Sequence, residues 1–325
     1  MSLLRYAIAV DVGGTKMAAA VVDSSGAIVS QIRRPTDRRG GEAAAVQVAE
    51  LARRVLEPAG LAWDAVAAVG VDVPGICFTG TGEVWAPNLP GWDSIPLRKM
   101  LEAALPRPVV IDSDRVACVL GEQWRGAARG LTDIVFLTIG TGIGAGIISG
   151  GRLCRGAQGI AGAAGWLALT PQSCELYRQV GCFEAEAAGP AVARRAAAIA
   201  AQRPTRMLEL AGGCLELITP ETVVEAARRG DPAAQDVLAE TARYLGMGLA
   251  NLVSLLNPQM IVLGGGLMAG AEWLLEPARR EMMVWAQPVA AQTVRVVLSE
   301  LGADAALLGA ARLALEPDLC QQNDT

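Results

Sequence analysis

Residues 6–22, YAIAVDVGGTKMAAAVV, place two apolar runs on either side of a glycine pair, and this arrangement decides how the rest of the chain can fold. Both runs are too apolar for strands with one face in water, so we expect both faces to be covered, as in an α/β sheet. Gly13 and Gly14 allow unusual backbone angles and close approach, and backbone N–H groups in such a turn can hold phosphate oxygens. Asp11 at the strand end can then reach a magnesium ion or its waters. A plain β-hairpin with Asp11 as a turn residue is the simpler interpretation of this stretch alone.

The same design returns at residues 133–149, DIVFLTIGTGIGAGIIS, where an apolar strand, a glycine-rich turn at 140–144 and a second apolar strand follow one another. Two copies about half a chain apart predict a duplicated domain, with two phosphate-binding turns facing one cleft. The repetition makes two unrelated hairpins the weaker interpretation.

Length and charge bound the class of protein. The 325 residues fit about two domains, and the net charge of -5 argues against a nucleic-acid surface. The longest apolar stretches, 134–148 and 245–256, are interrupted by glycine or too short to cross a bilayer, so no membrane partner is expected. The first strand begins by Tyr6, which leaves no room for a secretory signal, and a cytoplasmic location is expected.

The sequence contains no histidine, so the commonest general base and the commonest zinc ligand are both missing. Its seven cysteines are scattered without CxxC spacing, which indicates buried or free thiols. Acid–base chemistry must therefore fall to carboxylates, Lys, Tyr or Cys. The best candidate is Asp114, because Asp112-Ser113-Asp114 joins a strand to a helix at the strand end where ligands bind in open α/β sheets. One of Asp112 and Ser113 is expected to be the N-cap.

Hydrophobic periodicity and turn residues predict the remaining elements. Strands are expected at 6–10, 17–22, 27–33, 65–71, 108–111, 260–263 and 293–298, besides the two in 133–149. Helices are expected at 42–56, 95–105, 114–124, 181–201, 222–229, 232–256, 267–285 with a break near Pro277, and 303–314. Residues 72–92 are expected to be a long structured loop and 316–325 a frayed tail. Asn88 in that loop either contacts a ligand or caps a turn.

Several motifs in order resemble the ROK family of sugar kinases and repressors, and the likeness covers essentially the whole chain. The motifs are AVDVGGTK at 9–16, GVDVPG at 70–75, APNLPGW at 86–92, SDRVACVLGE at 113–122, FLTIGTGIGAGI at 136–147, RGAQGIAG at 155–162, GCFEAEAAG at 181–189 and IVLGGG at 261–266. The resemblance implies a two-domain α/β fold of the actin-like, hexokinase-like (ribonuclease H-like) type. This fold has a duplicated β-β-β-α-β-α core and a cleft between its two domains. We expect a small domain at 1–112, completed by the C-terminal helix 303–318, and a larger domain at 113–302.

The resemblance also implies roles for individual residues in an ATP- and magnesium-dependent sugar kinase. Asp114 matches the catalytic base, and Asp11 lies near the magnesium, bound through water. The substrate-binding residues would be Asn88, Ser113, Asp114, Trp166 and Glu184. The cofactor-binding residues would be Asp11, Gly13, Gly14, Thr15 and Lys16 in the first phosphate motif, Thr138, Gly140, Thr141 and Gly142 in the second, and Gly264, Gly265 and Gly266 in the adenosine motif.

The chain departs from the family pattern around the sugar. Ser113 replaces the usual Asn before the catalytic Asp, and residues 163–166, AAGW, replace the usual Glu-x-Gly-His, whose His also binds a structural zinc. Of the family's three zinc cysteines only Cys182 remains, because Glu175 and Tyr177 stand where the other two would fall. We therefore expect no zinc site.

These departures leave the substrate open. A glucokinase-like transfer from ATP to a hexose hydroxyl, at the 6-position, is the leading hypothesis, and an N-acylhexosamine such as N-acetylmannosamine is the alternative acceptor. Trp166 either packs on the sugar or fills the space of the absent zinc lobe. A protein of the same fold that binds sugar and nucleotide without catalysis is the rival from another class. The apolar face of 232–256 and family precedent favour a homodimer.

Overall fold

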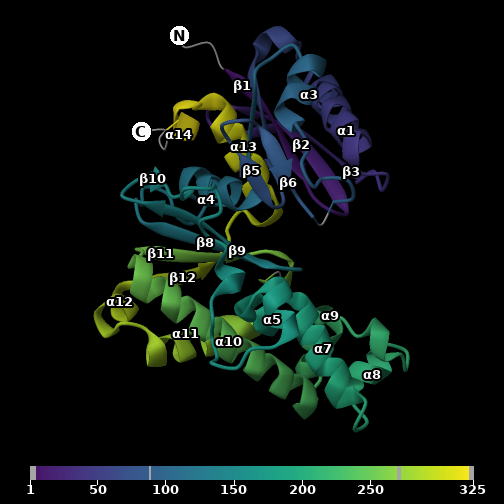
Figure 1. Ribbon diagram of the computed structural model, residues 1–325, viewed down its shortest axis with the longest axis vertical. Coiled ribbons are helices and arrows are strands. Elements are labelled where there is room, and N and C mark those ends of the chain that lie inside the picture. The colour runs from purple at the N-terminus through teal and green to yellow at the C-terminus, as the bar shows by residue number, and fades with distance from the viewer. Residues whose placement is uncertain (1–4, 88, 269–271, 322–325) are drawn as a thin grey trace. The chain divides into compact units, whose positions relative to one another are not determined.

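The computed structural model describes residues 5–87, 89–268 and 272–321 (Figure 1). Its first sheet has the strand order β3-β2-β1-β4-β7. The strands are β1 (Tyr6–Val12), β2 (Lys16–Asp23), β3 (Ile28–Pro35), β4 (Val66–Val73) and β7 (Val109–Ser113). β1 pairs with β2 and β2 with β3 in antiparallel fashion, whereas β1, β4 and β7 run parallel. The carboxyl ends of these three parallel strands therefore meet at one edge of the sheet.

A second sheet has the order β10-β9-β8-β11-β12. Its strands are β8 (Ile134–Ile139), β9 (Ile143–Ser149), β10 (Arg152–Leu153), β11 (Met260–Gly264) and β12 (Arg295–Leu298). In both sheets a three-strand meander is followed by two strands that the chain reaches through helices. The repeated order confirms the duplicated core that the two glycine-rich turns predicted.

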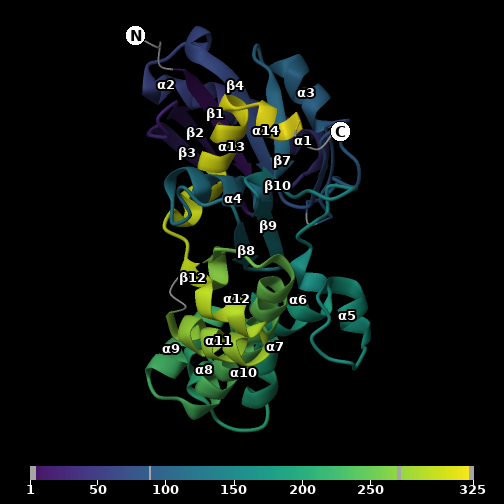
Figure 2. The ribbon, with the colours of Figure 1, turned by 90° about the vertical axis from the view of Figure 1, so that its left-hand side faces the viewer.

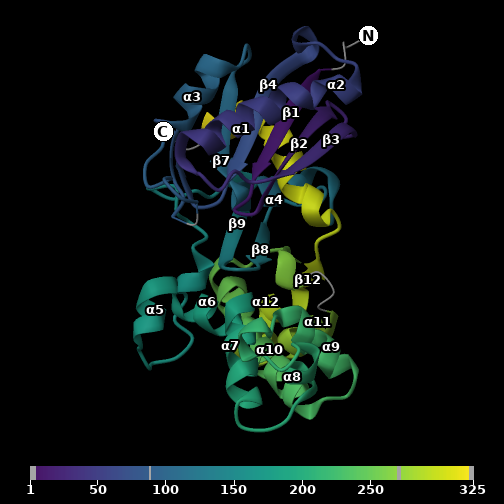
Figure 3. The same cartoon turned by 90° about the vertical axis from the view of Figure 1, so that its right-hand side faces the viewer.

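Alternate residues of the first sheet pack against helices on opposite faces, because successive side chains of a strand point to opposite sides. On one face Ile8 and Val10 join α1 (Gly41–Arg54) and α3 (Leu97–Ala104) in one apolar cluster (Figure 3). On the other face Ala7 and Ala9 join α13 (Ala305–Leu315) in a second cluster (Figure 2). Covering both faces is what the uninterrupted apolar runs at residues 6–22 required.

Small residues bring α4 (Asp114–Arg125) unusually close to α13. A Cβ at Gly309 would collide with the Ala117 carbonyl, and one at Gly121 would collide with the Ala305 carbonyl. These backbone approaches fix the helix whose first residue is Asp114.

The described residues form two compact units, one within 1–136, 146–162 and 299–325 and the other within 137–145 and 163–298. Helix α13 packs on β1, β2 and β4 of the first unit. The expected domain boundary between residues 112 and 113 stays a prediction.

The helices of the second unit follow in chain order. They are α5 (Glu175–Val180), α6 (Cys182–Ala187), α7 (Gly189–Ala200), α8 (Arg206–Leu210), α9 (Pro220–Arg228), α10 (Pro232–Leu256), α11 (Glu272–Trp285) and α12 (Pro288–Thr293). The long helix expected at 232–256 is confirmed. Its N-cap is Asp231, whose side chain accepts hydrogen bonds from the first turn, and its C-cap is Asn257, which adopts a left-handed conformation.

Several expectations for individual elements were wrong. The loop expected at 72–92 contains a hairpin of β5 (Ile76–Phe78) and β6 (Glu83–Trp85). The helix expected within 181–201, after the first two residues of that stretch, begins earlier, at Cys182, and is interrupted at Ala188, which has an extended conformation. No break occurs at Pro277, since α11 continues through it. Part of the expected frayed tail forms a short helix, α14 (Asp318–Gln321).

Within residues 5–87, 89–268 and 272–321, no helix has both the length and the hydropathy that crossing a membrane would need.

Candidate active site

Asp114 begins helix α4 directly after β7. Ser113 is the N-cap, and its hydroxyl accepts a hydrogen bond from the Val116 N–H at 3.4 Å, so of the two N-cap candidates it is Ser113 that fills this role. The Asp114 carboxylate is half-buried and accepts a hydrogen bond of 2.8 Å from the Arg115 N–H. Removal from water raises the pKa of Asp114 to about 6, although the Arg115 charge lowers it. A carboxylate with a pKa near neutrality is suited to accept a proton.

The first glycine turn joins β1 to β2. It lies at the same end of the sheet as Asp114, because β1 runs parallel to β4 and β4 to β7. The Gly13 N–H donates to the Lys16 carbonyl at 3.1 Å, and the Thr36 hydroxyl donates to the Gly13 carbonyl at 2.6 Å. A Cβ at Gly13 would lie 2.6 Å from the Lys16 oxygen, whereas its φ lies outside the left-handed region. Close approach, rather than an unusual φ, is therefore the reason for glycine at position 13. Gly14, Thr15 and Lys16 are exposed at the turn.

Asp11 and Asp72 are the penultimate residues of the neighbouring strands β1 and β4 and form a cross-strand pair in register. Burial raises the pKa of Asp11, while a hydrogen bond from the Asp72 carboxyl group and the positive charge of Lys16 lower it. Asp72 is completely buried, and neither of its carboxylate oxygens has a hydrogen-bond donor among the described residues. Burial, followed by the negative charges of Asp11 and Asp114, raises the pKa of Asp72 well above its usual range. Our sequence interpretation missed Asp72, although an acid at the end of an apolar strand, in GVDVPG, was a visible signal.

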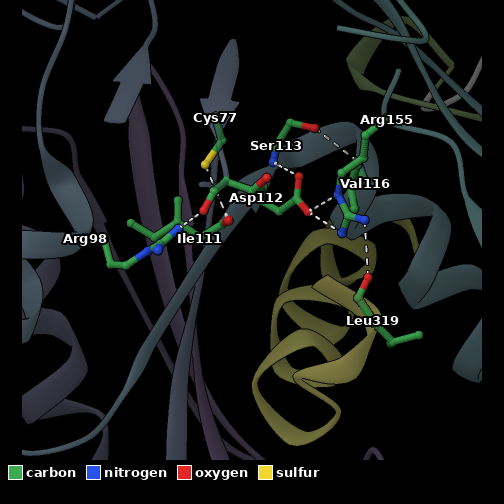
Figure 4. Close-up of polar contacts among 9 residues, drawn as sticks. Cys77, Arg98, Ile111, Asp112, Ser113, Val116, Arg155 and Leu319 are labelled. Carbon is green, nitrogen blue, oxygen red and sulfur yellow. Dashed lines mark hydrogen bonds and ion pairs between the residues drawn. The ribbon is translucent and has the colours of Figure 1, made fainter. Parts of the chain in front are cut away.

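Asp112 occupies the next position in register, on β7, but has a different environment (Figure 4). The Arg155 guanidinium donates two hydrogen bonds to one Asp112 oxygen at 2.8 and 3.0 Å, and both side chains are buried. Arg155 also donates to the Leu319 carbonyl at 3.2 Å. This ion pair ties the RGAQGIAG segment and α14 to the end of β7, one residue before Ser113.

The second glycine turn joins β8 to β9. The Gly140 N–H donates to the Gly142 carbonyl at 3.0 Å, and the Gly189 N–H donates to the Gly140 carbonyl at 2.8 Å. Glu184 of α6 accepts a hydrogen bond of 2.7 Å from the Ile143 N–H, and burial raises the pKa of Glu184. Glu184 thus contacts the turn that carries Gly140, Thr141 and Gly142, while Thr138 is half-buried in β8.

The three glycines at the end of β11 have different surroundings. Gly264 is buried within the strand. Gly265 has a φ of 92°, and a Cβ there would lie 2.5 Å from the Ile139 carbonyl oxygen of β8. A Cβ at Gly266 would meet nothing within 4 Å. Gly266 borders a hollow of about 320 Å³, which is lined by Pro220, Glu221, Val224, Glu225, Arg228, Gly266 and Leu267. Its volume is within the range of small-molecule pockets, so Gly266 is the glycine with room for a ligand.

The remaining predicted substrate residues are placed only in part. Trp166 is the last residue of a short 3₁₀ turn, η2 (Ala164–Trp166), and 58% of the Trp166 surface is exposed. Trp92, in contrast, is fully buried, and its indole N–H donates to the Gly41 carbonyl at 3.1 Å. Asn88 lies outside the described residues. The structure brings Asp11 and Asp114 to one sheet edge and Glu184 to the second glycine turn.

Among the side chains that the structure describes, no group of three or more Cys, Asp or Glu residues could hold a metal ion. Cys182 is buried, and its sulfur accepts a hydrogen bond from the Leu169 N–H at 3.4 Å. The absence of a zinc site stays a prediction. Magnesium needs few protein ligands, because it usually keeps several waters and binds through one or two carboxylates and substrate phosphates. The neighbouring carboxyl groups of Asp11 and Asp72 fit that requirement, since the Asp72 oxygens have no donor among the described residues.

Comparisons with known proteins agree with this geometry. A family model described as the ROK family matches residues 7–317. A glucokinase from Streptomyces coelicolor is 36% identical over 327 aligned positions, which cover 96% of this chain and 98% of that protein. A glucokinase from Halalkalibacterium halodurans is 31% identical, and the aligned region covers 94% of this chain and 93% of that protein.

Solved structures give the same result. A ROK family glucokinase from Streptomyces griseus, in complex with glucose and AMPPNP, is 34% identical with a TM-score of 0.80, over 96% of this chain and 99% of that one. A ROK hexokinase from Thermus thermophilus is 37% identical with a TM-score of 0.78, over the same shares. The motifs, the duplicated sheets and these likenesses together show that the chain belongs to the ROK family.

Proposed function

We propose that this protein is an ATP-dependent sugar kinase that acts on glucose, at its 6-hydroxyl, in the manner of its glucokinase relatives. The observation that carries the proposal is Asp114, a half-buried carboxylate at the start of α4 with a pKa of about 6. A free carboxylate at physiological pH can accept the proton of a sugar hydroxyl as that oxygen attacks the γ-phosphate. The relatives named glucokinase match this chain over nearly its full length and support the substrate class.

The residues of each unit have separate tasks in this mechanism. In the first unit, the turn at Gly13 and Gly14 binds phosphate oxygens, with Thr15 and Lys16 exposed beside it. Asp11, with Asp72 behind it, would hold magnesium, which neutralises charge on the transferring phosphoryl group. Asp114 accepts the proton of the attacking hydroxyl.

In the second unit, the turn at Gly140, Thr141 and Gly142 binds further phosphate oxygens. Adenosine occupies the hollow beside Gly266. Glu184, half-buried and bonded to the backbone of the phosphate turn, hydrogen-bonds sugar hydroxyls.

A second candidate substrate is an N-acylhexosamine. The observation that favours it is the exposed Trp166, which follows the small residues Ala163, Ala164 and Gly165 in the sequence. An aromatic face beside small residues can pack on an acetamido methyl group or on a sugar ring.

A coupled assay of ADP release with Mg·ATP, run in parallel on glucose, mannose, N-acetylglucosamine and N-acetylmannosamine, tests the proposal. We expect glucose to give the highest kcat/KM. A preference for N-acetylmannosamine would favour the second candidate. Absence of ADP release with every sugar would contradict the kinase and support a non-catalytic binding protein. Location in the cytoplasm and assembly as a homodimer remain proposals, and gel filtration with light scattering tests the latter.

A further inference from the structure

Residues 163–166, which stand where the family carries its sugar-binding Glu-x-Gly-His, form the sugar loop. Helix α5 lies beside this loop and is weakly packed. It has six residues, none of them buried, and the preceding residues 171–174 are all exposed. Isolated helices of this length are not stable in water, so α5 depends on tertiary contacts. It contacts α6 and η2, and Leu176, Tyr177 and Val180 are its half-buried side chains.

The Tyr177 hydroxyl connects α5 to the interior of its unit. It donates a hydrogen bond of 2.6 Å to one carboxylate oxygen of Glu186, and the other oxygen accepts from the Arg195 guanidinium at 2.9 Å. The Glu186 and Arg195 side chains are only 16% and 18% exposed. Hydrogen bonds to an ionised group are about twice as strong as neutral ones, and here solvent screening is reduced.

Arg195 extends the connection to the longest helix. Its guanidinium donates to the Thr241 hydroxyl at 3.0 Å, and that hydroxyl, completely buried, donates to the Val237 carbonyl at 2.8 Å within α10. The guanidinium also lies 5.8 Å from the centre of the Tyr244 ring. A row of polar contacts therefore runs from the surface helix α5 to the core helix α10.

The other end of α5 touches the sugar loop. The Gly181 N–H donates to the Tyr177 carbonyl at 2.9 Å, and Gly181 has a φ of 91°. A Cβ at Gly181 would collide with the Gly165 carbonyl and lie 2.8 Å from the Trp166 Cα. Because the backbone at residue 181 lies directly against the backbone of residues 165 and 166, no residue larger than glycine fits at position 181.

Helix α6 is held from two sides. Glu184 and Glu186 are two residues apart, which places them on roughly opposite sides of a helix. Glu184 faces the second glycine turn and accepts from the Ile143 N–H, while Glu186 accepts from Tyr177 and Arg195. Loss of the Tyr177 bond would free α5 without cutting the bond between Glu184 and the phosphate turn.

We propose that Tyr177 is a positioning residue for sugar recognition, an inference that rests on the proposed kinase function and on sugar binding at residues 163–166, where the family carries its sugar-binding motif. Its hydroxyl, anchored through Glu186 and Arg195, fixes α5, and α5 in turn fixes Gly181 against Gly165 and Trp166. The sugar would be recognised by a loop whose position is set by this chain of contacts.

The test compares Tyr177→Phe with Tyr244→Phe in the full-length protein. Both variants lose one phenolic hydroxyl from the same cluster, but Phe at 244 keeps a ring against Arg195. For Tyr177→Phe we expect amide hydrogen exchange in residues 163–181 to rise about tenfold, the scale of one lost hydrogen bond to a charged group. We expect KM for glucose to rise by a similar factor, while kcat and KM for ATP change less than about twofold. Tyr244→Phe should behave as the wild type in every measurement.

Two results would overturn the inference. One is unchanged exchange at residues 163–166 in Tyr177→Phe, and the other is faster exchange there with an unchanged KM for the sugar. A wild-type protein that phosphorylates no sugar contradicts the proposed function instead. In that case exchange at residues 163–166, measured without ligand, still decides whether Tyr177 positions the loop.

Discussion

Asp72 on β4 lies in register with Asp11 on β1, and the buried Asp72 carboxylate has no hydrogen-bond donor among the described residues. Two acids side by side at the end of a sheet disfavour the folded state unless a proton or a cation lies between them. We therefore expect the Asp11–Asp72 pair to lower the stability of the folded protein and to have its function in the active site.

Asp72→Asn should stabilise the protein in the absence of magnesium. The pKa of Asp72 is raised in the folded state, so its contribution to stability is lost as the pH rises above the unfolded value of about 3.9 towards the folded pKa. Asparagine removes this loss, and we expect the free energy of unfolding at pH 8 to rise relative to the wild type, with little change at pH 4. Urea unfolding at pH 4 and pH 8 measures it, and a gain that is equal at both pH values would refute the explanation.

Arg155→Met should be strongly destabilising. It leaves the Asp112 carboxylate buried without its cation, which typically costs about 3–5 kcal/mol. Arg279→Met is the matched control, because Arg279 pairs with Glu276 at 2.7 Å at the surface, where such pairs contribute less than about 1 kcal/mol. Chemical denaturation of both variants gives the comparison. Similar losses for the two would mean that burial of the Asp112 pair is not what matters.

Neighbouring glycines at the end of β11 should respond differently to alanine. Gly265→Ala places a Cβ against the Ile139 carbonyl at a φ of 92°, so we expect a loss of about 1–3 kcal/mol in stability. Gly266→Ala meets open space and should unfold like the wild type, yet bind ATP at least about fivefold more weakly because it narrows the hollow beside it. Calorimetric titration with ATP measures the affinity. Unchanged affinity in Gly266→Ala would place adenosine elsewhere.

The strands that flank both glycine turns could be predicted because apolar runs closed by glycine turns are local signals. Asp114 could be predicted as a candidate base because it lies where a strand is followed by a helix, and this junction is visible in the local sequence. Arg155 could not be paired with Asp112 in the same way, because 43 residues separate them and only the folded chain brings them together. The hairpin within 72–92 was missed because its strands have three residues each, too few to show an alternating pattern. The reason for glycine at positions 265 and 181 is likewise a contact with distant backbone.

The activity should fall in acid as Asp114 becomes protonated. Its pKa is about 6, and a general base works only in the deprotonated form. We expect kcat/KM for the sugar to be level above that pH and to fall about tenfold per pH unit below it. A pH–rate profile from about pH 5 to 8 measures this dependence of the free enzyme. Constant kcat/KM down to pH 5 would exclude a base with this pKa.

The most direct test of the proposed mechanism is the turnover of Asp114→Asn with glucose and Mg·ATP, measured together with ATP affinity. Asparagine keeps the shape of the side chain and removes its capacity to accept a proton. We predict that kcat falls at least about 100-fold, the lower part of the range for a positioned base, while ATP affinity stays within about twofold of the wild type. Turnover close to that of the wild type would contradict the assignment of Asp114 as the base.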